Sequence, residues 1–158
     1  MVVRKAERKD ADRINALLFQ VQQVHADGRP DIFVGGAKKY TNEELYVIME
    51  DSSRPIYVAV DEEDNVWGYA FCIYEEPTNT ENLQPIKTLY IDDLCVDEVA
   101  RGKHIGSLLY EYVLNTAKKN NCYRVTLNVW CLNETAMRFY EKCGLTPLKI
   151  TMEKKIND

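Results

Sequence analysis

The feature of this sequence that most constrains its fold is the stretch of residues 91–107, which reads IDDLCVDEVARGKHIGS. It begins as an apolar strand, passes through a charged turn at Asp97 and Glu98, and reaches the basic, glycine-bearing turn 101–106. A helix should follow, because apolar residues recur at the spacing of one helix face: Ile105, Leu108, Leu109, Tyr112 and Val113. A basic turn before the positive end of a helix, where the first N–H groups have no internal partner, suits phosphate.

Two familiar phosphate-binding loops do not fit this turn. The nucleotide-binding P-loop needs a lysine directly after its second glycine, whereas Lys103 precedes Gly106 and Ser107 follows that glycine. The dinucleotide fingerprint needs three glycines, and the stretch contains two, Gly102 and Gly106. On these six residues alone, a capped turn that opens a surface helix is the alternative to a binding loop.

Length and charge limit the class of protein. A chain of 158 residues can bury a substantial core, and its length predicts one domain, residues 1–158. The formal net charge of −5 argues against nucleic acid as a partner, and it suits a cationic substrate such as an amine, although solubility alone also explains it. No apolar run approaches the ~20 residues of a membrane span, and residues 1–5 turn charged at once, so we expect neither a signal peptide nor a membrane partner.

Cysteine usage indicates the redox environment. The five cysteines are scattered without C-x-x-C spacing: Cys72, Cys95, Cys122, Cys131 and Cys143. An odd number at irregular spacing argues against a disulfide framework and against a structural zinc site. We therefore expect a cytoplasmic protein without a metal, in which most cysteines are small core residues.

Hydrophobic periodicity and turn residues predict the order of elements. The expected strands cover residues 2–6, 56–60, 66–74, 87–96 and 123–129, with a closing strand near 147–152. Helices are expected over 10–28, 41–50, 105–118 and 133–143, the second opened by a capping box of Thr41 and Glu44. A helix joins strands 87–96 and 123–129, so these two should run parallel in an otherwise largely antiparallel sheet.

Three segments of the second half resemble motifs of the GNAT superfamily of acetyltransferases, in the family's order and spacing. They are residues 92–96 (DDLCV), the loop 101–106 with its helix, and residues 133–145 (NETAMRFYEKCGL). The loop resembles the pattern Arg/Gln-x-x-Gly-x-Gly/Ala, except that His104 stands where the family usually has its first glycine. The last segment resembles Asn-x-x-Ala-x-x-x-Tyr-x-x-x-Gly-Phe, with Leu145 in place of phenylalanine. The resemblance in motifs covers residues 56–152, and the resemblance in the order of helices and strands covers the whole chain.

The resemblance implies an α/β (α+β) fold of the GNAT type: a mixed, mostly antiparallel sheet with one parallel, splayed strand pair, flanked by about four helices. It also implies an enzyme that moves an acetyl group from its co-substrate acetyl-CoA to a primary amine by direct attack in a ternary complex. A non-catalytic acyl-CoA-binding sensor on the same fold is the alternative. The resemblance does not identify the acceptor, which can be a small-molecule amine (polyamine, aminoglycoside, metabolite) or a peptide amine (N-terminus, lysine). It also leaves open whether the protein forms a homodimer.

The resemblance also assigns the residues that contact the cofactor. In the family, the pantetheine lies between the splayed strands and pairs with strand backbone, here around Leu94, Cys95 and Val96. Backbone N–H groups of the loop would hold the pyrophosphate: Arg101, Gly102, Lys103, His104, Ile105, Gly106 and Ser107. A histidine can donate its N–H there only if its φ is negative, which leaves the loop geometry open. Asn133 would bind the cofactor, cap its helix, or do both.

Acetyl transfer to an amine makes three chemical demands. A lysine-like amine with a pKa of about 10.4 must lose a proton before it attacks, which costs about 4–5 kcal/mol at neutral pH. The tetrahedral oxyanion needs a donor, which the family takes from a strand amide, here near Leu94 or Cys95. The departing CoA thiolate benefits from a proton donor, and Tyr140 stands at the family's position for it. The alternative for Tyr140 is ordinary core packing.

For the base, the local candidates are Asp92 and Asp93. Adjacent strand residues face opposite ways, so at most one of the two should point into the cleft. Asp92 and Leu94 are two residues apart and should point to the same face of the strand, so Asp92 is the predicted base. The alternative is a chain of water molecules with no single base. Some family members carry a glutamate at the position of Asn128, which cannot accept the proton.

Overall fold

The computed structural model describes residues 1–79 and 81–157, and the chain divides into two compact units, Met1–Asn128 and Val129–Asp158. The first unit contains a five-stranded sheet with its covering helices, and the second contains the last helix of the chain. That both units form one domain, residues 1–158, stays a prediction.

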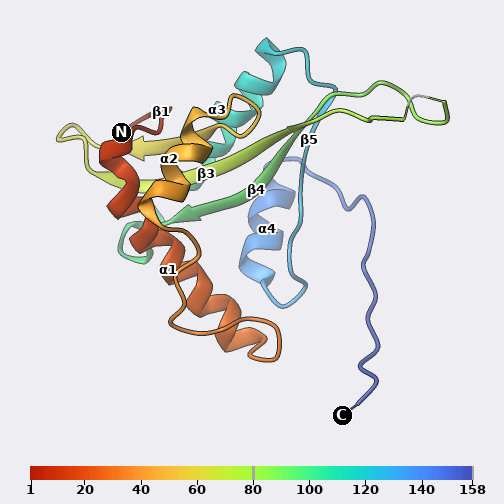
Figure 1. The fold of residues 1–158 in the computed structure, drawn as a ribbon, viewed down its shortest axis with the longest axis horizontal. Coiled ribbons are helices and arrows are strands. Elements are labelled where there is room, and N and C mark those ends of the chain that lie inside the picture. Colours follow the sequence, from red (N-terminus) through yellow and green to blue (C-terminus); the bar gives the residue numbers. More distant parts are fainter. Residues whose placement is uncertain (80, 158) are drawn as a thin grey trace. The chain divides into compact units, whose positions relative to one another are not determined.

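The sheet has the strand order β1-β2-β3-β4-β5 (Figure 1). Its strands are β1 (Val2–Lys5), β2 (Ile56–Val60), β3 (Val66–Glu75), β4 (Thr88–Val96) and β5 (Arg124–Leu127). The first four pair antiparallel with their neighbours in chain order, and β5 runs parallel to β4. The prediction of a mostly antiparallel sheet with one parallel pair is confirmed.

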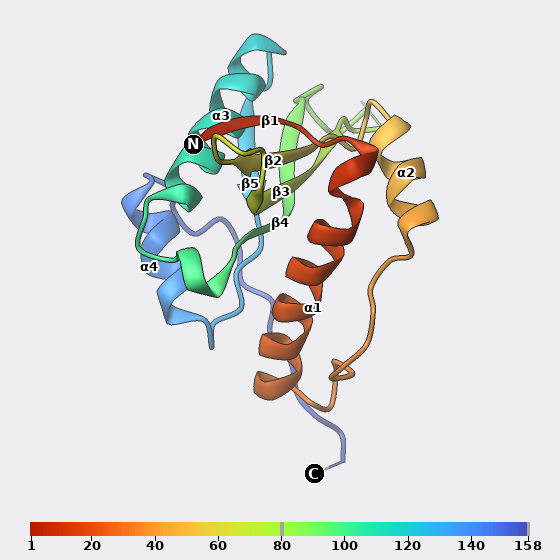
Figure 2. The same ribbon diagram turned by 90° about the vertical axis from the view of Figure 1, so that its left-hand side faces the viewer.

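Helices cover both faces of this sheet (Figure 2). On one face, α1 (Ala11–Gly28) and α2 (Asn42–Glu50) bury side chains against β2 and β3 in a single hydrophobic cluster that includes Ile14, Leu45, Val58, Tyr69 and Phe71. On the other face lies α3 (Ile105–Lys119), which makes the crossover from β4 to β5. Two short 3-10 turns, η1 (Arg8–Asp10) and η2 (Glu98–Ala100), precede α1 and α3.

The contact between α3 and the sheet depends on Gly68 of β3. A Cβ atom at this position would lie 2.8 Å from the carbonyl oxygen of Cys95 and 3.0 Å from Cδ1 of Leu109. Real side chains do not approach a backbone oxygen so closely, so only glycine lets β3, β4 and α3 pack at this distance.

The two helices of the α1–α2 face begin as the sequence predicts. At α2, the Thr41 hydroxyl accepts a 3.1 Å hydrogen bond from the Glu44 N–H, and the Glu44 carboxylate accepts one of 3.4 Å from the Thr41 N–H, which confirms the capping box. Before α1, the buried Asp10 carboxylate accepts 2.8 Å hydrogen bonds from the Arg4 guanidinium and the Glu7 N–H. This ties β1 to the start of α1.

The second unit contains α4 (Glu134–Lys142). The Asn133 side chain accepts a 3.1 Å hydrogen bond from the Ala136 N–H, as a predicted N-cap should, and Gly144 with φ +92° follows the end of the helix. The expected closing strand near 147–152 is wrong: residues 145–157 are not in a strand. Their alternating apolar side chains resemble a strand pattern, but a strand also needs a paired neighbour, and the described residues of this unit form none.

None of the helices in the described part of the chain combines the length and the hydropathy that crossing a membrane requires.

Candidate active site

The shorter strand β5 covers only the first part of its parallel neighbour β4. The two strands pair from Thr88 opposite Arg124 to Ile91 opposite Leu127, and the pairing stops there. Beyond Ile91, β4 continues to Val96 beside β3 alone among the strands described. One edge of β4, including the predicted cofactor contacts at Leu94, Cys95 and Val96, therefore has no strand partner on the β5 side within residues 1–79 and 81–157. The parallel pairing is as predicted, and a splay of the two strands beyond this point stays a prediction.

A β-bulge lies in β4 directly after its last residue paired with β5. Phe71 of β3 pairs with Asp93 while Cys72 pairs with Ile91, so Asp92 is an extra residue without a pairing partner on β3. A bulge interrupts the alternation of side chains along a strand, and both carboxylates lie on the α1–α2 face: Asp93 accepts a hydrogen bond from Tyr69, and Asp92 lines a cavity with Phe71. Strand parity therefore does not separate the two aspartates, and the choice between them stays a prediction.

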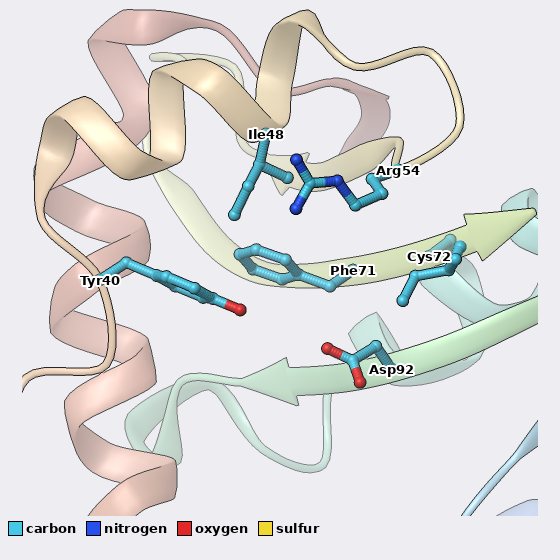
Figure 3. Close-up of a pocket in the computed structure, with 7 residues that line it drawn as sticks. Tyr40, Ile48, Arg54, Phe71, Cys72 and Asp92 are labelled. Carbon is cyan, nitrogen blue, oxygen red and sulfur yellow. The ribbon is translucent and has the colours of Figure 1, made fainter.

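The cavity beside Asp92 has a volume of about 70 Å³ (Figure 3). Its walls come from the segment before α2, from α2 itself, from the segment before β2, and from β3 and β4; they are Tyr40, Ile48, Arg54, Phe71, Cys72, Ile73 and Asp92. Figure 3 shows the Phe71 ring between the Arg54 guanidinium on one side and the Asp92 carboxylate on the other, with the Tyr40 hydroxyl pointing toward Asp92. One cation, one anion and two aromatic rings therefore line the cavity.

The position of Arg54 is fixed by its own loop. Its Nε donates a 2.8 Å hydrogen bond to Oδ2 of Asp51, whose other oxygen accepts from the Ser53 hydroxyl at 2.6 Å and the Ser53 N–H at 2.9 Å. These bonds, led by that of the Ser53 hydroxyl, lower the pKa of Asp51 to about 2. The next residue, Pro55, accepts a 2.9 Å hydrogen bond from the Cys72 N–H, so the loop is fastened to β3 beside the cavity.

The second aspartate, Asp93, lies in a half-buried polar cluster. The Tyr69 hydroxyl donates a 2.7 Å hydrogen bond to its Oδ2. Removal from water raises the pKa of Asp93, and the charge of Asp92 raises it further, while the Tyr69 hydrogen bond and the positive charges of Lys39 and His25 act in the opposite direction. The two adjacent carboxylates therefore have different surroundings: Asp92 is exposed and Asp93 is only partly accessible.

Two buried thiols lie close to these carboxylates. Desolvation raises the pKa of Cys72, which lines the cavity, to about 12, and it raises the pKa of Cys95 to about 12 as well. At neutral pH both side chains are therefore thiols rather than thiolates, and a thiol is a poor nucleophile.

The basic turn after β4 leads into α3 in an unexpected backbone conformation. His104, the N-cap of α3, has φ 61° and ψ 20°, so the negative φ that we required for this histidine is not present. Histidine is one of the few residues other than glycine that populate this left-handed region with some frequency. His104 therefore occupies the conformation for which glycine is the default residue.

The turn presents donors and cations together at the start of α3. The first hydrogen bond of α3 joins the Leu108 N–H to the His104 carbonyl at 3.1 Å. The N–H groups of Ile105, Gly106 and Ser107 come before this bond and therefore have no partner within the helix. The preceding residues Arg101, Gly102, Lys103 and His104 are exposed. Positive side chains and N–H groups at the positive end of the helix dipole are suited to an anion, and binding of one here stays a prediction.

Two predicted site residues belong to the second unit. Asn133 caps α4, and Tyr140 lies in the second half of the same helix, with its ring 5.0 Å from that of Phe139. Both are placed within their own unit, Val129–Asp158. Their roles toward the cofactor stay predictions. Asn128, at the end of the first unit, donates a 3.1 Å hydrogen bond to the Tyr90 hydroxyl.

Sequence reasoning missed Tyr40 and Arg54. The sequence contains a usable signal for Tyr40, which directly precedes the N-cap residue Thr41. An apolar residue at this position commonly packs against the first turn of the helix. Arg54 carries no such signal: it is a single arginine in a polar loop, and only the pairing of that loop with β3 places it at the cavity.

Comparison with known proteins identifies the class. The sequence profile described as the acetyltransferase (GNAT) family matches residues 20–145. This match covers most of the chain, and the protein belongs to the GNAT family, whose members are acetyl-CoA-dependent N-acetyltransferases.

Individual relatives agree with this family. The chain is similar to the BH1408 protein of Bacillus halodurans, in a crystal structure of its tetramutant, with 31% identity, a TM-score of 0.93 and coverage of 99% of this chain and 100% of that one. It is 37% identical over 68 residues to the glucosamine 6-phosphate N-acetyltransferase of Arabidopsis thaliana, a segment that spans 43% of this chain and 44% of the relative. The crystal structure of glucosamine-6-phosphate N-acetyltransferase from the same plant matches over 98% of this chain and 97% of that one, with a TM-score of 0.66 and 25% identity.

Within residues 1–79 and 81–157, no group of three or more histidine, cysteine, aspartate or glutamate side chains is arranged to hold a metal ion.

Proposed function

We propose that this protein transfers the acetyl group of acetyl-CoA to a primary amine by direct attack within a ternary complex. The observation that carries the proposal is the edge of β4 beyond Ile91, which has no strand partner on the β5 side among the described residues and leads toward the basic N-terminus of α3 in a chain of the GNAT family. An unpaired strand edge can hydrogen-bond an amide-containing ligand, and a basic helix N-terminus can bind its phosphates.

The cofactor contacts follow from these two features. Backbone groups around Leu94, Cys95 and Val96 pair with the pantetheine amides, and the amide near Leu94 or Cys95 also donates to the oxyanion. The N–H groups of residues 101–103 and 105–107 bind the pyrophosphate, with the side chains of Arg101 and Lys103 adding positive charge. The His104 N–H is left out of this set, because its φ is positive. Asn133 adds a contact from the N-terminus of α4, a role supported by its place in the family motif.

Asp92 removes the proton from the acceptor amine, directly or through one water molecule. Its carboxylate is exposed at the cavity, whereas Asp93 already accepts the hydrogen bond from Tyr69. The negative charge of Asp93 next to Asp92 helps to attract the ammonium form of the acceptor. Tyr140 donates a proton to the departing thiolate, a role supported by the family motif that contains it.

Direct attack is favoured over an acetyl-enzyme intermediate. An acetyl-cysteine route requires a thiolate near the acetyl group, and the high pKa values of Cys72 and Cys95 keep both thiols of this region protonated at neutral pH. Because neither of these thiols is activated, the proposed route is attack of the amine itself on the thioester.

The acceptor class is a small-molecule amine first and a peptide amine second. The A. thaliana relative is named for glucosamine 6-phosphate, a small amine. A cavity of about 70 Å³ has the volume of roughly two water molecules in the liquid, which also favours the end of a small molecule.

Release of the free CoA thiol from acetyl-CoA, measured across a panel of amines, tests this proposal. We expect at least one amine to stimulate release, and we expect Asp92→Asn to lower kcat by the ~10²–10⁴-fold typical of a lost general base. A non-catalytic acyl-CoA sensor would bind acetyl-CoA and release no thiol with any amine.

A further inference from the structure

We infer that the acceptor carries an anionic group, a carboxylate or a phosphate, a few atoms from its amine, and that Arg54 binds this anion. The inference deepens the proposed function and rests on it, because it takes the cavity beside Asp92 as the place where the acceptor binds. It narrows the acceptor to amino acids and other amines that bear an acid group.

The charges around the cavity are complementary to such a molecule. Arg54 and Asp92 face the same small space from either side of the Phe71 ring (Figure 3). In the proposed binding mode the amine points toward Asp92 and the other end of the acceptor reaches past Phe71 toward the guanidinium of Arg54. An anion there gains a charge-assisted hydrogen bond, whereas a second ammonium, as in a polyamine, is repelled.

Arg54 is held in place and still has donors to offer. Asp51 accepts from its Nε, and a guanidinium carries four further N–H bonds on its two terminal nitrogens. Figure 3 shows one of these terminal nitrogens on the side of Phe71 and the other directed away from it. The bonds from Ser53 to Asp51 fix the partner of Arg54, so little side-chain freedom is lost when the anion binds.

Bulk charge leads to the opposite expectation. The net charge of −5 suits a purely cationic acceptor, but the charges that face the cavity are one cation and one anion. Long-range attraction acts on the approach of a ligand, while contacts within a desolvated site decide which ligand fits.

Matched pairs of amines that differ by the acid group provide the test. Suitable pairs are propylamine with β-alanine, ethanolamine with O-phosphoethanolamine, and glucosamine with glucosamine 6-phosphate. For the wild-type protein we expect a higher kcat/KM for the acid-bearing member of at least one pair. The carboxylate and phosphate arms then show which anion Arg54 accepts.

Arg54→Gln should remove this preference. We expect kcat/KM for the acid-bearing amine to fall roughly 10–100-fold, the range for a lost hydrogen bond to a charged group, and kcat/KM for the partner that lacks the acid group to stay within about twofold. Arg8→Gln is the matched control, because Arg8 also pairs with a carboxylate, Glu50, but is exposed and lies outside the cavity.

Ligand-induced stabilisation gives a readout that does not depend on turnover. The preferred acid-bearing amine should raise the melting temperature of the wild-type protein and of Arg8→Gln, but not that of Arg54→Gln. A preference for the members that lack the acid group or for dicationic amines, or an equal loss for both members of a pair in Arg54→Gln, would overturn the inference while leaving acetyl transfer intact. If no amine is acetylated but the Arg54-dependent stabilisation is present, the proposed function is the part that fails.

Discussion

The Tyr69 hydroxyl donates a 2.7 Å hydrogen bond to Oδ2 of Asp93, on the face of the sheet that α1 and α2 cover. This bond favours the charged form of a carboxylate whose pKa is raised, on balance, by its removal from water. The active-site region therefore contains an acid whose ionisation opposes folding.

Replacement of Asp93 should make the free energy of unfolding less sensitive to pH. The folded-state pKa of Asp93 is raised above the ordinary value near ~3.9, so the folded protein binds this proton more tightly than the unfolded chain does. The stabilising effect of that proton is fully present below the unfolded pKa and is lost as pH rises through the folded pKa. Asp93→Asn should therefore gain stability over the wild type at pH 8, and the gain should shrink toward pH 4, as urea unfolding at both pH values would show.

Tyr69→Phe is the companion variant. It removes a bond that lowers the pKa of Asp93, so it should cost more stability at pH 8, where the carboxylate is charged, than at pH 4. Equal effects of each variant at both pH values would mean that Asp93 titrates alike in the folded and unfolded chain.

His104→Gly should leave the protein at least as stable as the wild type. A left-handed backbone costs a residue with a Cβ about 1–2 kcal/mol, and glycine avoids this cost but loses about 0.5–1 kcal/mol through its more flexible unfolded state. We expect a net gain of up to about 1 kcal/mol in urea unfolding, with acetyl-CoA affinity retained. His104→Val, which tolerates φ 61° poorly, should lose stability; a loss in the glycine variant instead would show that the imidazole contributes to folding.

Gly68→Ala should destabilise the packing of α3 on the sheet. The added methyl group would meet the Cys95 carbonyl at 2.8 Å and Leu109 at 3.0 Å, so the strands or the helix must shift, at a cost of about 1–3 kcal/mol. Gly28→Ala is the matched control, because a Cβ there has no atom within 4 Å. Chemical denaturation should separate the two variants, and equal stabilities would mean that α3 adjusts freely.

Tyr140→Phe should lower kcat and leave binding of acetyl-CoA unchanged. The ring and its packing against Phe139 remain, while the phenol proton is lost, so kcat and kcat/KM should fall together by the ~10²–10⁴-fold typical of a lost general acid. The alkaline fall of the wild-type pH–rate profile should weaken in the variant. Near-full kcat with an unchanged profile would make Tyr140 a packing residue.

Local patterns predicted what depends on neighbours in the sequence. The capping box of Thr41 and Glu44, the N-cap Asn133 and the glycine after α4 each act through contacts within a few residues, and each is present. The parallel pairing of β4 with β5 followed from one crossover helix, because chain connectivity restricts the topology.

Features that depend on distant pairing could not be predicted in this way. The bulge at Asp92 arises from the register between β4 and Phe71–Cys72 of β3, which no alternation within β4 reveals. Arg54 reaches the cavity only because Pro55 pairs with Cys72. The pattern near 147–152 is typical of a strand, but no neighbour in its described unit pairs with it.

A single-turnover experiment tests acetyl transfer by direct attack most directly. Protein in excess over acetyl-CoA labelled in its acetyl group is mixed with an amine that stimulates thiol release, and the label is followed in the amine, the protein and the remaining acetyl-CoA. Direct attack in a ternary complex should move the label to the amine with one CoA released per acetylated amine, and intact mass should show no acetylated protein at any time. Label that stays in bound acetyl-CoA would indicate a sensor, and label that passes through the protein would indicate a covalent intermediate; either result would disprove the mechanism.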